Sequence, residues 1–106
     1  MNMQNALTEG VFYILLSLCT PMHGYGIMQN VEKLSGGRVR LAAGTLYGAI
    51  NTMLEKGWIK ALPGEKDSKK KVYETTQVGL EILQGELQRL EELLQNGNHV
   101  LGGAAK

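Results

Sequence analysis

The sequence predicts a mainly α-helical fold with a small β-hairpin, in the order three helices, two short strands and a long final helix. Apolar residues recur at helical spacing in four stretches, and the spacing changes to alternation between residues 58 and 76. Glycine or proline separates these stretches. The chain has 106 residues, 43% hydrophobic and 20% charged, which indicates one small globular domain rather than a disordered or membrane protein.

The first helix is expected over Leu7–Cys19, with Thr8 at its start. It must end before Pro21, because the residue that precedes a proline disfavours helical geometry. Residues 11–18 are apolar on nearly every face, which is typical of a helix that is covered on more than one side. The domain's own core is expected to cover one side, and a second surface to cover the other.

The second helix is expected over Gly24–Leu34, and the glycines that follow Ser35 end it. The third is expected over Ala43–Lys56 and ends at Gly57. Its start has no side-chain cap, since alanine and glycine offer no oxygen there. Its apolar stripe consists of Leu46, Ile50, Met53 and Leu54, and its opposite face carries Gly44, Tyr47, Gly48, Asn51 and Glu55.

Residues 58–62 and 71–76 alternate as the two strands of a hairpin do, around a polar, turn-rich tip. The final helix is expected over Thr76–Asn96, with Gly97 as its stop. This order of elements is the layout of a winged helix-turn-helix with a C-terminal extension. We therefore predict a DNA-binding domain over residues 1–76, a C-terminal dimerisation helix over 77–97 and a flexible tail over 98–106.

The charge is unevenly distributed although the chain carries only +1 overall. Residues 36–75 hold eight basic and four acidic side chains, a net charge of +4, whereas residues 76–106 carry −2. A basic middle favours a surface that meets an anionic polymer.

Four motifs lie in order along the chain. They are His23-Gly24-Tyr25-Gly26-Ile27, then Leu41-Ala42-Ala43-Gly44-Thr45-Leu46-Tyr47, then Leu54-Glu55-Lys56-Gly57-Trp58-Ile59, then Lys70-Lys71-Val72-Tyr73 followed by Thr76 and Gly79. This set resembles the signature of PadR-type transcriptional regulators, and the resemblance covers about residues 7–94. It implies a bacterial homodimer that binds DNA, usually represses transcription and often releases DNA when a small molecule binds. The size is similar to the family's short-tailed branch, which keeps a single C-terminal helix for dimerisation.

The third helix carries the residues that we predict to position and read DNA: Thr45, Tyr47 and Asn51. The small residues beside them allow the backbone to approach base edges in the major groove. The hydroxyl and amide groups can then reach bases or phosphates. At the hairpin tip, Lys66, Lys69, Lys70 and Lys71 are predicted to hold phosphates as point charges, without reading sequence.

A leucine stripe on the final helix predicts a dimer interface. Leu80, Leu83, Leu87, Leu90 and Leu94 repeat at the spacing of a coiled-coil seam. Two heptads are too few for a stable coiled coil, so the first helix is expected to supply the rest. Its spare face is predicted to be Val11, Ile14, Leu15 and Leu18.

No pattern of catalytic or metal-ligating residues is found, so we predict no enzyme activity, no cofactor and no metal. Cys19 is expected to be a buried structural cysteine. A single cysteine and the lack of a signal peptide or membrane span predict a cytoplasmic location. The predicted partners are a palindromic DNA operator, a second copy of the chain and, as the resemblance implies, a small-molecule effector. The alternative is a winged-helix protein-interaction module that does not recognise a DNA sequence.

Overall fold

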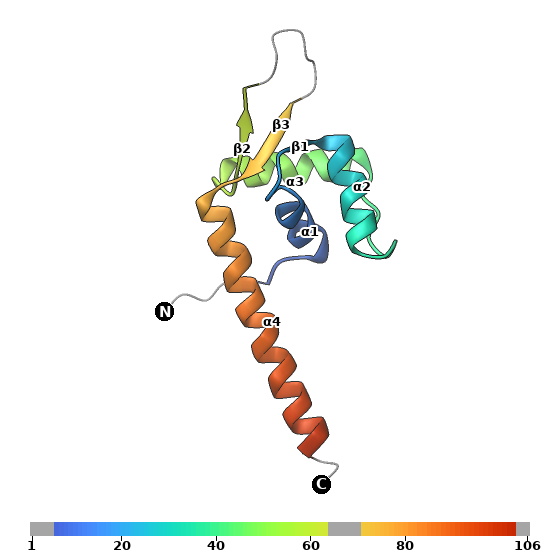
Figure 1. The fold of residues 1–106 in the computed structure, drawn as a ribbon, viewed down its shortest axis with the longest axis vertical. Helices are drawn as coiled ribbons and strands as arrows, with labels where there is room; N and C mark the ends of the chain where they lie inside the picture. The colour runs from blue at the N-terminus through green and yellow to red at the C-terminus, as the bar shows by residue number, and fades with distance from the viewer. Residues whose placement is uncertain (1–5, 64–70, 104–106) are drawn as a thin grey trace.

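The computed structural model describes residues 6–63 and 71–103, which form four helices and a three-stranded antiparallel sheet. The elements are α1 (Glu9–Ser17), β1 (Met22–His23), α2 (Gly24–Leu34), α3 (Ala43–Glu55), β2 (Ile59–Leu62), β3 (Val72–Thr75) and α4 (Gln77–Gly103). The β2–β3 hairpin extends from one end of the molecule, and α4 extends from the other (Figure 1). The predicted mainly helical winged fold is confirmed.

The helix boundaries have local causes. Thr8 caps α1, where its hydroxyl oxygen accepts a hydrogen bond from the Val11 amide at 3.1 Å. His23 caps α2 through Nδ1, which accepts from the Gly26 amide at 3.4 Å. The start of α3 has no side-chain cap, as predicted. At its end, Gly57 takes a φ of 75°, which is why a glycine stands there.

The sheet has the order β1-β3-β2, so it contains one strand that the sequence did not predict. Met22 and His23 form β1 and pair with Tyr73 and Val72 of β3. Two residues are too few to show an alternating pattern, which explains why the strand was missed. Its effect is to join the start of α2 to the first two residues of β3.

The core surrounds α1, which lies between α2, α3 and α4 (Figure 1). Its buried apolar residues are Ile14, Leu15, Leu18, Ile27, Val31, Leu46, Ile50, Met53, Ile59, Tyr73 and Leu83. Ile14, Leu15 and Leu18 are at most 1% exposed within the single chain. The prediction that they form a spare face for a partner is therefore wrong, because the chain's own helices cover more than one side of α1. Val11 is half-buried, and Leu16 is the exposed apolar residue of this helix.

Helix α4 is longer than predicted, since it continues through Gly97 to Gly103. A glycine inside a helix costs only about 1 kcal/mol, and Gly97 does not take the positive φ of a helix stop. The predictions that the helix ends at Asn96 and that a flexible tail begins at residue 98 are wrong, since residues 98–103 are helical. The division of the chain into a DNA-binding domain and a dimerisation helix stays a prediction.

The first half of α4 packs on the domain, where Leu83 is buried and Glu86 is only 2% exposed. The prediction that Leu83 faces a second copy is therefore wrong, because the chain's own core covers it. The Glu86 carboxylate accepts a hydrogen bond from the Leu7 amide at 3.2 Å and two from the Arg89 guanidinium at 2.7 Å. These bonds satisfy a charge that would otherwise be costly to bury. The second half extends beyond the other helices (Figure 1).

Two further findings concern the surface. Cys19 is exposed, so the prediction of a buried cysteine is wrong. Its Sγ lies 3.7 Å from the Leu15 carbonyl oxygen, and partial burial raises the pKa of the thiol. Within residues 6–63 and 71–103, no helix is long and apolar enough to cross a membrane.

Candidate nucleic-acid interface

The outer face of α3 carries two glycines and three exposed polar residues. Gly44 and Gly48 lie on this face, and no neighbouring atom comes within 4 Å of the place where a Cβ would stand. Thr45, Tyr47 and Asn51 are all exposed around them. The apolar side of the same helix, which includes Leu46 and Ile50, is fully buried. The core therefore holds α3 with this polar face directed outward.

Tyr47 is more constrained than the sequence indicated. Its side chain leaves α3 and lies against the first residue of α2, so that a Cβ on Gly24 would stand 2.8 Å from Cζ of Tyr47 and closer still to its hydroxyl. Tyr47 also lies near Tyr73 of β3: burial raises the pKa of Tyr73, and the nearby Tyr47 raises it further. The Tyr47 side chain thus packs against the start of α2, while 45% of the residue stays exposed.

Thr52 is a polar residue of this face that the prediction omitted. It is exposed, and its hydroxyl donates to the Gly48 carbonyl oxygen at 3.2 Å, one turn earlier in the helix. It follows Thr45 by seven residues, which places the two on the same side of a helix. That spacing is the signal by which the sequence could have identified it.

The hairpin supplies part of the expected positive charge. Lys71 is exposed immediately before β3. Lys66, Lys69 and Lys70 lie outside the described residues. Lys60 of β2 stands opposite Glu74 of β3, and its Nζ is 3.8 Å from that carboxylate.

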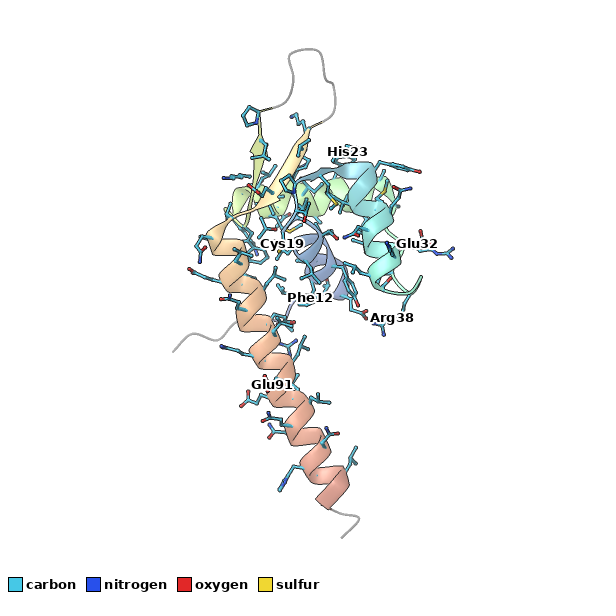
Figure 2. All side chains as sticks on the ribbon, in the orientation of Figure 1. Phe12, Cys19, His23, Glu32, Arg38 and Glu91 are labelled. Atoms are coloured by element: carbon cyan, nitrogen blue, oxygen red, sulfur yellow. The ribbon has the colours of Figure 1, made fainter. Side chains whose placement is uncertain are left out.

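The two arginines of the basic middle segment lie elsewhere. Arg38 contacts Glu9 of α1 at 2.5 Å, and Arg40 contacts Glu32 of α2 at 2.9 Å. Figure 2 shows His23 at one end of α2 and Arg38 near the other, away from the hairpin. The arginines of the basic middle segment therefore lie apart from the lysines of the hairpin. Both arginines already have carboxylate partners.

The groups on α3 and the hairpin are suited to binding a polyanion whose base edges can form specific hydrogen bonds. Glycines let a helix backbone come close to a groove, an amide and hydroxyls can bond bases or phosphates, and lysines attract phosphates. No group of three or more His, Cys, Asp or Glu side chains comes together as metal ligands would within the described ranges.

The α2–α3 pair followed by the β2–β3 hairpin defines a winged helix-turn-helix protein. The family model of the transcriptional regulator PadR-like family matches residues 11–85. The chain belongs to this family of transcriptional regulators, as its motifs indicated.

Solved structures show the same fold. A transcriptional regulator from Clostridium thermocellum superposes with a TM-score of 0.71 at 21% identity, covering 85% of this chain and 86% of that one. A PadR family regulator from Eggerthella lenta gives 0.68 at 22% identity, covering 86% and 76%. A PadR family regulator from Clostridium difficile gives 0.68 at 23% identity, covering 86% and 97%. No curated protein matches the chain significantly.

Proposed function

We propose that this regulator binds a roughly palindromic DNA operator as a homodimer and represses transcription in the cytoplasm. The observation that carries the proposal is the outer face of α3, where Gly44 and Gly48 have no neighbouring side chain within 4 Å of the place where a Cβ would stand and lie beside exposed Thr45, Tyr47 and Asn51. A solvent-exposed helix with no partner has no need of two glycines, which weaken it by about 1 kcal/mol each. A helix that must bring its backbone close to a groove does need them.

The roles follow from the side chains. Asn51 is suited to reading an adenine edge, because its amide can both donate and accept. Tyr47 packs against Gly24 of α2, so it enters the complex already oriented and loses little conformational freedom. Lys71 and the three lysines before it supply attraction to phosphates that does not depend on sequence.

The exposed half of α4 supports the dimer. Leu87, Leu90 and Leu94 are between 41% and 63% exposed, and they continue the stripe whose member Leu83 is buried in the domain. Leu101 extends the same spacing and is 77% exposed. An exposed run of this length is typical of an interaction surface. A second copy fits it best, because two copies supply identical stripes and place two recognition helices on one palindrome.

Selection of bound sequences from a random DNA pool tests the proposal. We expect an enriched inverted repeat, and a sedimentation mass of two chains without DNA. Recovery of DNA with no common sequence would contradict sequence recognition and favour the protein-interaction module. A single-chain mass at micromolar concentration would contradict the dimer.

Release by a small molecule is the remaining part of the proposal, and it rests on the family resemblance. The only tryptophan, Trp58, lies beside β2 with Lys56 Nζ 4.8 Å from its ring centre, and α4 has no aromatic residue. Helix α4 therefore offers no tryptophan on which a bound effector could stack. Compounds that release the selected operator in a competition assay would identify the effector.

A further inference from the structure

The start of α4 is bonded directly to the end of α3. The Thr76 amide donates to the Trp58 carbonyl oxygen at 2.9 Å, and the Thr76 hydroxyl donates to the Gly57 carbonyl oxygen at 2.6 Å. The same hydroxyl oxygen accepts a hydrogen bond from the Gly79 amide at 3.2 Å, as a helix N-cap does. The hydroxyl proton of Thr76 therefore bonds the segment that ends α3, and a lone pair of the same oxygen caps α4.

Gly79 allows these two helices to meet without a gap. A Cβ at this position would stand 3.1 Å from the Trp58 carbonyl carbon, closer still to its oxygen, and 2.6 Å from Cγ2 of Thr75. The Trp58 atoms belong to the backbone and cannot rotate away as a side chain would. Any side chain at residue 79 would therefore push the first turn of α4 away from Trp58.

The other side of this contact is equally well fixed. The Trp58 amide donates to the Met53 carbonyl oxygen at 2.9 Å, and the Gly57 amide donates to that of Leu54 at 3.1 Å. This pair of bonds is a Schellman motif, which ends α3 in a defined geometry. We call Gly57, Trp58, Thr76 and Gly79 the α3–α4 joint.

Thr75 attaches the same point to α1. Its amide donates to the Leu18 carbonyl oxygen at 2.8 Å, and its hydroxyl donates to that of Leu15 at 2.8 Å. Thr75 is 8% exposed, so these bonds are shielded from competing water. The direction in which α4 leaves the domain is thus determined relative to both α1 and α3.

We propose that the α3–α4 joint sets the distance between the two recognition helices of the dimer, with Thr76 and Gly79 as its positioning residues. The inference rests on the proposed DNA-binding dimer. Helix α4 has 27 residues, so it is about 40 Å long. A tilt of about 10° at the joint would move its far end by roughly 7 Å, which is about two base-pair steps. A small change at the joint therefore alters which half-site spacing the dimer fits.

Two substitutions of Thr76 separate the joint from the helix cap. Thr76→Ser keeps both the proton for Gly57 and the oxygen for Gly79. Thr76→Asp keeps an acceptor for the Gly79 amide, but a carboxylate has no proton to donate to the Gly57 carbonyl. Each variant is titrated with the selected operator, with operators one base pair longer or shorter between half-sites, and with a single half-site duplex. Sedimentation and thermal unfolding are measured alongside.

We expect the parent and Thr76→Ser to prefer the selected spacing to the same degree. In Thr76→Asp the preference should fall about three- to tenfold, the change in ratio that corresponds to one missing hydrogen bond. Affinity for the single half-site should stay close to the parent's, because α3 itself is unchanged. A folded Thr76→Asp dimer with the parent's spacing preference would overturn the inference, as would an equal loss of affinity on every duplex.

Gly79→Ala provides an independent perturbation that adds no charge, and it should shift or broaden the spacing preference. Gly10→Ala in α1 is the matched control, because a Cβ there meets Leu41 Cδ2 at an ordinary 3.5 Å. It should leave the preference unchanged. If the parent itself prefers no spacing, the proposed function is contradicted. If the parent prefers one spacing and both joint variants keep that preference, the proposed role of the α3–α4 joint is contradicted and the proposed function is not.

Discussion

The hydroxyl of Tyr47 on α3 lies against the Cα of Gly24 on α2, in the space that a Cβ would occupy. This contact fixes the direction of an exposed aromatic side chain on the proposed recognition face. It also gives Gly24 a role that helix propensity does not explain, since glycine weakens a helix.

Gly24→Ala should therefore weaken operator binding while the free energy of unfolding changes little. The new methyl group displaces the Tyr47 ring, and because that residue is 45% exposed, the ring can move into solvent without opening the core. Operator titrations by fluorescence anisotropy and chemical unfolding measure the two effects.

A double-mutant cycle distinguishes this mechanism from a change in α2. In a Tyr47→Ala background, Gly24→Ala should have almost no further effect on DNA affinity, because the group that it displaces is already gone. Additive losses of affinity would show that Gly24 acts on DNA binding by another route.

Asn51→Ala should cost about 1–3 kcal/mol of operator binding and relax the preference at one base position. The side chain is exposed, so thermal stability should be close to that of the parent. Gln88→Ala on α4 is the matched control, an exposed amide on the side of the helix opposite the leucine stripe. The DNA sequences that the two variants select are compared with those that the parent selects. If Asn51→Ala selects the same sequences as the parent, Asn51 does not contact a base.

Replacing Lys69, Lys70 and Lys71 by glutamine should reduce the salt dependence of DNA binding. The plot of log K against log salt has a negative slope. Each phosphate that a lysine no longer neutralises makes this slope shallower by about 0.9 per subunit. Lys33→Gln is the control, because Lys33 is in the last turn of α2, at the end remote from the sheet. A slope that falls equally in the control would mean that the hairpin lysines have no special place at the DNA.

Leu87→Glu should convert the dimer into folded monomers. Leu87 is 51% exposed in the single chain, so a charge there is tolerated until a partner covers it. Two unpaired carboxylates in one interface cost several kcal/mol, which raises the dimer dissociation constant at least about a hundredfold. Sedimentation of Leu87→Glu beside Gln88→Glu, an equal charge off the stripe, measures this. A Leu87→Glu dimer as tight as the control would place the interface elsewhere.

The elements with strong local signals were predictable. The bounds of α2 agree with the prediction, and α3 ends one residue earlier, because the glycines that end both helices lie within a few residues of their last turns. The hairpin was visible as a change of period. The polar face of α3 followed from the same periodicity, since its apolar stripe had to face the core.

What the sequence could not show depends on contacts between distant segments. Gly97 looked like a helix stop, yet the helix continues, because a single glycine does not outweigh its neighbours. The apolar surface of α1 was evident from the sequence. Which of its residues the chain's own core covers depends on packing, and Ile14 is buried in that core. The contact between Gly24 and Tyr47 joins residues 23 positions apart, and no periodic pattern records it.

The central claim is recognition of a DNA sequence by the face of α3, and a ratio of affinities tests it most directly. The dissociation constants of the selected operator and of a scrambled duplex of equal length and composition are measured in parallel at 150 mM salt and again at 300 mM. Charge alone attracts both duplexes equally, whereas base contacts distinguish them. We predict that the operator binds at least about a thousandfold more tightly at both salt concentrations. A ratio near one, with both affinities falling together as salt rises, would contradict the claim.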